Sequence, residues 1–154
     1  MIDRVARKQA AETLRHFVSG QITNDEFIRR YPYSKRDPVI WALDDTVWCL
    51  YDDISTHKLT GEYAPTREFR KQAARWLMFL YSDEEYLWPM IGRPGFRSSS
   101  ESLWLSWIFG FGQGRLKKFM ASGDFEVWPF LRREDFERAR KNAVLMTVSG
   151  RGDR

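Results

Sequence analysis

The sequence has 154 residues, of which 43% are hydrophobic, 30% charged and 16% aromatic, including seven Trp residues. This length fits one domain, and this composition excludes an intrinsically disordered chain. The N-terminus is charged and no apolar run reaches the length of a membrane span, so we expect no secretory signal or transmembrane helix and predict a cytoplasmic protein. Cys49 is the single cysteine, which excludes an internal disulfide and leaves no Cys and His set for structural zinc.

The first two helices are predicted from local start and stop signals. Apolar residues recur at near-helical spacing over residues 2–18, and Gly20 supplies a left-handed end. Thr23 and Glu26 form a capping box, in which each side chain bonds the backbone amide of the other residue. This box predicts a short helix that ends before Pro32, because a residue that precedes proline avoids the α region.

A third helix is predicted over residues 39–57, opened by Asp37 as a cap and by Pro38 at the first helical position. A fourth is predicted over residues 66–81, and its apolar second half is expected to be buried. These two helices carry the predicted core, which comprises Leu43, Val47, Leu50, Ile54, Phe69, Ala73, Trp76, Leu77 and Leu80.

Four residues of the third helix form a second stripe, nearly opposite the aliphatic one. They are Trp41, Asp45, Trp48 and Asp52. Either other helices cover this stripe and arginines from residues 67–75 pair with the carboxylates, or the stripe stays exposed and binds a partner. We expect covering helices, because a domain with seven Trp residues must bury most of them.

The C-terminal part of the chain gives fewer signals. In residues 101–110 apolar side chains recur at every second position, which also suits a strand. A capping box at the start of this segment favours a helix instead. A short basic helix follows Gly114, residues 126–130 suit a short strand, and a last helix is predicted over residues 133–143. Residues 144–154 are expected to form a loose tail.

These elements predict an all-α fold, or nearly so, with five to seven helices in a single domain over residues 1–143. At most a minor two-stranded element is expected at the two Trp-Pro segments. Both segments belong to an internal echo, in which residues 79–93 match residues 119–133 at an offset of 40. The echo is either a duplicated ligand-holding unit or two similar packing units in which Trp fills the core, and we favour packing.

Asp53 and His57 are the candidate catalytic residues, because a spacing of four places them together on one helix face. With Asp45 and Asp52 they are the basis of a hypothesis of a small hydrolase or metal enzyme. A metal site needs about three protein ligands, however, and nothing in the sequence places His16 nearby. A histidine at a helix C-terminus, favoured there by the helix dipole, is the simpler interpretation.

The net charge of +4 arises in residues 115–154. A basic patch is a candidate nucleic-acid surface, although its residues alternate with acids and we expect at most weak, nonspecific binding. The Gly110–Gly114 loop could cradle an anion, but it matches no phosphate-binding motif and is interpreted as a turn. The basic patch consists of Arg115, Lys117, Lys118, Arg132 and Arg133.

The run FLYSDEEYLWP follows a helix that carries paired aspartates. In this respect the chain resembles small bacterial proteins that form a family of unknown function. The resemblance implies a compact, stand-alone bacterial protein, and it implies no activity and no site residues.

No cofactor motif is present, so we expect a non-enzymatic protein-interaction module that needs no cofactor and no membrane and whose partner is another protein. An immunity- or antitoxin-like inhibitor is one form of this hypothesis. A basic chain, however, is a poor imitation of the acidic substrates of nuclease toxins. The enzyme and the nucleic-acid binder remain the alternatives.

Overall fold

The computed structural model describes residues 1–48, 51, 55–89 and 113–149. Within these residues the chain forms six α-helices and two short 3-10 helices and no sheet, which confirms the predicted all-α fold. A single bridge between Thr23 and Lys58 is the one extended pairing in this part of the chain. The helices are α1 (Arg4–Val18), α2 (Asn24–Arg30), α3 (Pro38–Trp48), η1 (Gly61–Tyr63), α4 (Arg67–Tyr81), α6 (Gln113–Met120), η2 (Phe125–Val127) and α7 (Arg133–Ser149).

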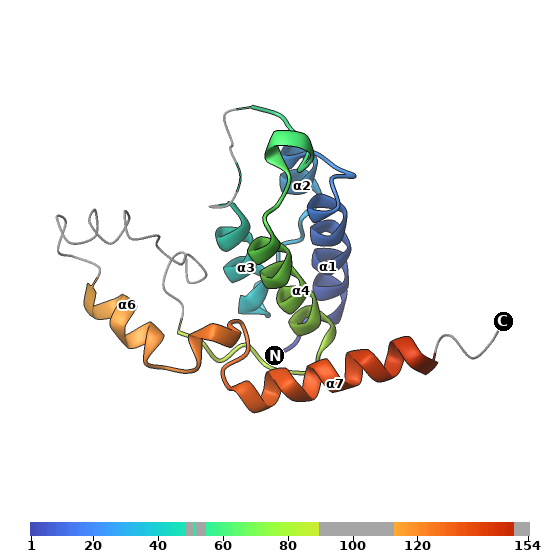
Figure 1. Cartoon of the computed structure of the whole chain (residues 1–154). Coiled ribbons are helices and arrows are strands. Elements are labelled where there is room, and N and C mark those ends of the chain that lie inside the picture. The colour runs from blue at the N-terminus through green and yellow to red at the C-terminus, as the bar shows by residue number, and fades with distance from the viewer. Residues whose placement is uncertain (49–50, 52–54, 90–112, 150–154) are drawn as a thin grey trace.

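The helices α1 and α4 lie side by side and form the centre of the molecule (Figure 1). The helices α2 and α3 pack against α1, and α7 crosses the end of this pair beside α4. The helix α6 lies at the opposite end of the picture from the C-terminus. No helix in the described residues is long and apolar enough to cross a membrane.

The two central helices meet over a core of small and aromatic side chains. Ala10 and Ala11 of α1 are completely buried, and their small size lets α4 approach closely. Phe17 lies near the end of the same face and packs on Phe27 of α2, with 4.8 Å between the ring centroids. Val5, an apolar residue of the predicted stripe, is 79% exposed, because it falls outside the face that α4 covers.

The ends of α1 and α2 follow the local signals. The side chain of Asp3 accepts a hydrogen bond from the Ala6 amide and caps α1. Gly20 has a φ of +71°, as predicted for a left-handed stop. The capping box of Thr23 and Glu26 is present at the start of α2.

The predicted third helix is too long. In the described residues α3 ends at Trp48, and the segment around His57 is not helical, so the predicted range of 39–57 is wrong. Leu43 and Val47 are buried as predicted, whereas Leu50 and Ile54 lie outside the described residues. Asn24 of α2 holds the later segment, through hydrogen bonds to the backbone of residues 55 and 57.

The helix α4 begins one residue later than predicted, with the Thr66 side chain as its cap. Its core residues Ala73, Trp76 and Leu80 are buried as predicted, but Phe69 and Leu77 are only partly buried. Its second half is not buried on every side, since Tyr81 is 59% exposed.

The C-terminal elements differ from the prediction in two places. The segment expected to be a strand at 126–130 contains the 3-10 helix η2 instead, so the two-stranded element is absent from the described residues. The last helix continues to Ser149, beyond the predicted end at 143. The helix predicted within 101–110 lies outside the described residues.

The two halves of the internal echo pack on each other. Trp88 and Trp128 are both 3% exposed, which supports the packing interpretation of the echo. The Trp88 indole donates to the Phe130 carbonyl oxygen at 3.1 Å, and the Trp128 indole donates to the Tyr86 hydroxyl at 3.4 Å. Each copy therefore supplies an acceptor, located two residues from its own Trp, to the indole of the other copy.

Candidate functional site

The helix α3 presents two large aromatic side chains at its surface. Trp41 is 39% exposed and Trp48 is 41% exposed. At about 100° per residue they differ by roughly 20° around the helix and are about 10 Å apart along it. Asp44 and Asp45 fall within about 60° of Trp41 on the same surface. We call these four residues the α3 face.

The prediction that other helices cover the two Trp residues is wrong, since each keeps more than a third of its surface exposed. Two exposed large aromatic side chains on one side of a helix make this side a candidate partner surface. Asp52, the fourth residue of the predicted stripe, lies outside the described residues. Asp44 was not included in the predicted stripe, although the same helical spacing would have found it.

The two carboxylates of the α3 face have unfavourable surroundings of different kinds. Partial burial raises the pKa of the Asp44 carboxyl, and the neighbouring charge of Asp45 raises it further. The Oδ2 atom of Asp45 is buried and accepts no hydrogen bond within the described residues. A cation bound beside Asp44 would favour its ionised form and so lower the raised pKa.

The contacts of His57 within the fold are those of a structural residue. Its Nδ1 lies 2.8 Å from the Ser55 carbonyl oxygen, which can only accept, so this nitrogen carries the proton. Its ring stacks on Tyr63 at a centroid distance of 4.2 Å, and its amide donates to the Asn24 side chain. The predicted position at a helix C-terminus is wrong, because the residue lies in an extended segment.

The described residues give no support to a metal centre. They contain no group of three or more His, Cys, Asp or Glu side chains that could hold an ion. Asp53, proposed as the partner of His57, lies outside the described residues, as does Asp52. The buried Nε2 of His57 has no hydrogen-bond partner within the same residues.

The residues of the predicted basic patch lie on α6 and at the start of α7. Lys117 and Lys118 are exposed on α6, and Arg132 is exposed before α7. Arg133 is engaged with Asp124, with Nε and Nη2 each 2.8 Å from Oδ2. The side chain of Arg115 lies outside the description.

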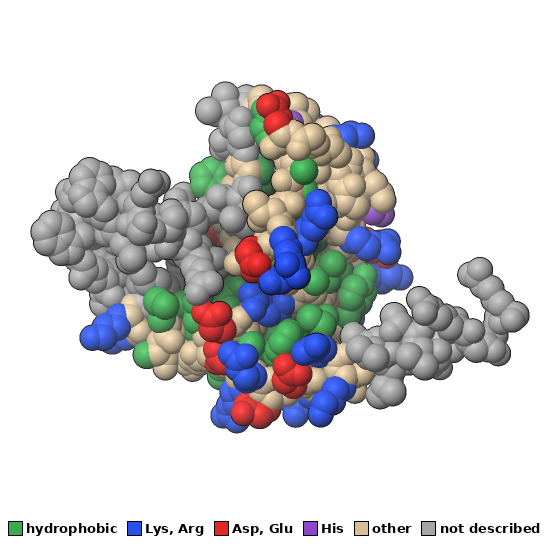
Figure 2. Space-filling view, viewed as in Figure 1, with side chains coloured by type: hydrophobic (Ala, Val, Ile, Leu, Met, Phe, Trp, Pro, Cys, Tyr) green, Lys and Arg blue, Asp and Glu red, His purple; other side chains and the backbone are tan. Residues whose placement is uncertain are grey.

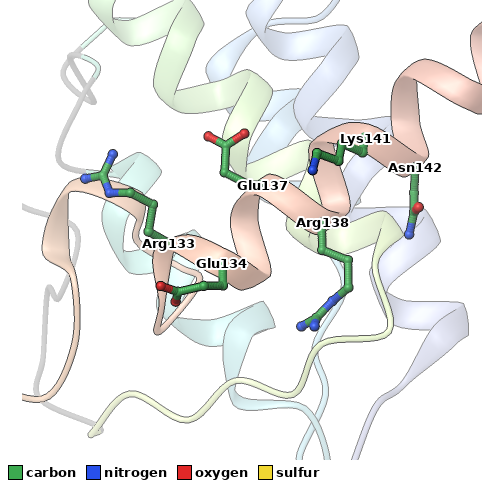
Figure 3. A pocket seen from close by; sticks show the side chains of 6 residues that line it. All are labelled: Arg133, Glu134, Glu137, Arg138, Lys141 and Asn142. Atoms are coloured by element: carbon green, nitrogen blue, oxygen red, sulfur yellow. The ribbon is translucent and has the colours of Figure 1, made fainter.

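An open hollow of about 510 Å³ runs along α7, and Figure 3 shows the side chains that line it. Three basic and two acidic side chains are mixed there, and two of the basic ones are paired with carboxylates. Arg138 donates to Glu84 and also to Asp135, which neutralises its charge. The lining residues are Arg133, Glu134, Glu137, Arg138, Lys141 and Asn142.

The structure also contains a buried charge cluster that the sequence analysis did not detect. The guanidinium of Arg7 pairs with the Asp37 carboxylate, and both side chains are almost completely buried. The same guanidinium donates to the carbonyl oxygens of Ser82 and Glu84. Every part of this cluster is satisfied by other parts of the fold, so its role is structural.

Comparison of the chain with protein families, with curated proteins and with solved structures finds no match. The site must therefore be interpreted from its own geometry.

Proposed function

We propose that this protein is a non-enzymatic interaction module that binds another protein through the α3 face. The observation that carries the proposal is the joint exposure of Trp41 and Trp48 on one side of a helix whose other side is core. Tryptophan is the residue type most enriched among the side chains that dominate protein–protein binding energy. The face lies on a regular helix, which fixes the spacing of the two Trp residues along it.

The partner of the α3 face is a basic segment. Asp44 and Asp45 place negative charge beside the indoles, and the raised pKa of Asp44 marks a position where a cation is favourable. A Lys or Arg side chain can stack on an indole face and pair with an adjacent carboxylate at the same time. An immunity- or antitoxin-like inhibitor, which binds one protein tightly, is the concrete form of the proposal.

Photo-crosslinking in the producing cells tests this function. With p-benzoylphenylalanine in place of Trp41, irradiation is expected to give one discrete adduct with another protein. The same substitution at Tyr33, which is 75% exposed on another segment, is the control and should give no such adduct. No adduct at position 41, or the same adducts at both positions, would contradict the proposal.

The identified partner then permits a quantitative test on the unmodified chain. Replacing Trp48 by Ala should weaken binding by about 2 kcal/mol, or roughly thirtyfold, if this residue is a dominant contact. The double variant Asp44→Lys, Asp45→Lys should lower the affinity for a basic partner further and make binding less sensitive to salt. Unchanged affinity in both variants would place the interface elsewhere.

A further inference from the structure

A groove of about 630 Å³ opens on another part of the surface, between the end of α1, the η1 segment and α4. Gly20 brings these parts together, because its Cα approaches Thr60 so closely that an added Cβ would lie 2.5 Å from the Thr60 methyl carbon. Gly61, in the left-handed region with a φ of +58°, faces open space on the groove side of this turn. The apolar lining comes from Val18, Leu59, Ala64, Pro65 and Leu77.

The charged residues that line the groove are both arginines. They are Arg15 on α1 and Arg70 on α4, and no Asp or Glu is among the lining residues that the structure describes. Both arginines are exposed, and neither has a carboxylate within ion-pair distance in the described residues. Figure 2 shows basic side chains on both sides of exposed apolar surface in the region of α1 and α4.

We propose that this groove binds an acidic segment of a partner protein, with apolar side chains in the groove and Asp or Glu side chains on Arg15 and Arg70. The apolar lining favours aliphatic side chains, and a guanidinium binds a carboxylate through two parallel hydrogen bonds. The groove is open to solvent, which suits a chain segment lying in it better than an enclosed small molecule.

This surface is independent of the α3 face. The two share no residue, and their charges are opposite, since the α3 face carries Asp44 and Asp45 whereas the groove carries Arg15 and Arg70. One face selects basic segments and the other selects acidic ones. The chain would therefore hold two segments of opposite charge, either from two partners or from one.

Selection from a phage-displayed library of random dodecapeptides on the immobilised full chain tests the groove. Enriched sequences should combine adjacent aliphatic residues with Asp or Glu, and their synthetic peptides should bind in solution. The double variant Arg15→Glu, Arg70→Glu should lose binding by more than about tenfold, and it should gain affinity for the same peptides with Lys in place of each acid.

Two further variants separate the groove from general charge. The double variant Lys117→Glu, Lys118→Glu makes the same change in net charge on α6 and should leave peptide binding unchanged. Ala64→Trp fills the exposed groove while keeping both arginines, and it should abolish binding. Circular dichroism and the unfolding midpoint of each variant must match the parent, which excludes loss of fold as the cause.

Several outcomes would overturn the proposal. They are the absence of any enriched peptide, enrichment of neutral or basic sequences, and equal binding by the Arg15→Glu, Arg70→Glu variant. A concentration-dependent dimer that Ala64→Trp dissociates would assign the groove to a second copy of the chain. Native mass spectrometry that detects a retained small molecule, lost in Ala64→Trp, would assign it to that molecule. The crosslinking at position 41 is unaffected by these results, so the two proposals fail separately.

Discussion

Arg7 and Asp37 form an ion pair in the interior of the protein, with 2.5 Å between the Arg7 Nε and the Asp37 Oδ2. The side chains are 1% and 2% exposed, and the guanidinium also lies 5.0 Å from the centroid of the Phe79 ring. The pair joins α1 to the turn before α3, and the hydrogen bonds from Arg7 to Ser82 and Glu84 add the segment after α4. One side chain thus fixes three parts of the fold.

Removal of the carboxylate should be strongly destabilising. In Asp37→Ala the guanidinium of Arg7 stays buried without its counter-charge, and the free energy of unfolding should fall by about 3–5 kcal/mol. Urea denaturation measures this value. The control is Glu84→Ala, which removes a partly buried partner of the exposed Arg138 and should cost less than about 1 kcal/mol. Equal losses in the two variants would show that the buried pair contributes no more than a surface one.

The same pair shows which parts of the fold a sequence can reveal. The Thr23 and Glu26 capping box and the stop at Gly20 were predictable, because their hydrogen bonds and torsion angles depend on neighbouring residues. Asp37 was predicted to cap its own helix by the same logic. Its carboxylate instead binds Arg7, 30 residues away, and no local pattern carries that information.

The candidate site was predictable to a similar extent. The spacing of seven residues puts Trp41 and Trp48 on one face, but exposure depends on which helices approach, so the expected cover was wrong. The prediction of a helix at His57 was wrong for a related reason. Asn24 bonds the backbone of its segment across 33 residues, and this contact replaces the helix that the local sequence favours.

The hydrogen bonds of the two indoles in the internal echo should contribute differently to the free energy of unfolding. Tyr86→Phe removes the acceptor of a long hydrogen bond from Trp128, at 3.4 Å, and should cost about 1 kcal/mol. Trp88→Phe removes a shorter bond to Phe130 and leaves a small void, so it should cost more, about 2–3 kcal/mol. Chemical denaturation compares them, with Tyr81→Phe as a control at an exposed position. A larger loss in Tyr86→Phe would contradict this ranking.

Asp44 should make the protein less stable as the pH rises from acid. Because its pKa in the folded protein is raised above the ordinary value of 3.8, the folded state binds more protons than the unfolded state just above that pH. This contribution to the free energy of unfolding is therefore most favourable at low pH, and it is lost as the pH rises through the raised pKa. Asp44→Asn should remove this dependence and increase stability at neutral pH.

The test of Asp44 compares variants, since other groups titrate in the same range with the opposite effect. Hydrogen bonds from the backbone lower the pKa of Asp3 and that of Glu26, so both stabilise the fold as the pH rises. Urea midpoints from pH 3 to 7 are measured for the parent, for Asp44→Asn and for Glu62→Gln, which makes the same charge change at an exposed position. If the difference in urea midpoint between the parent and Asp44→Asn does not change with pH, the raised pKa of Asp44 is refuted.

Gly20 and Gly61 provide a matched pair for separating backbone strain from steric contact. Both have positive φ, at +71° and +58°, so an alanine at either position costs about 1–2 kcal/mol in backbone conformation. Of the two, only Gly20 would bring the added Cβ against another atom, the Thr60 methyl carbon at 2.5 Å, whereas no atom of the described residues lies within 4 Å at Gly61. Gly20→Ala should therefore be more destabilising than Gly61→Ala by about 1–2 kcal/mol.

Thr60→Ser supplies the decisive comparison for this pair, because serine lacks the methyl group that the new Cβ would meet. In that background the cost of Gly20→Ala should fall toward that of Gly61→Ala, although the Leu59 carbonyl oxygen at 3.2 Å keeps part of the crowding. The free energies of unfolding of the four variants form a double-mutant cycle. A coupling energy of zero would mean that the close approach of α1 to the Thr60 turn, which forms one side of the groove, does not exist in solution.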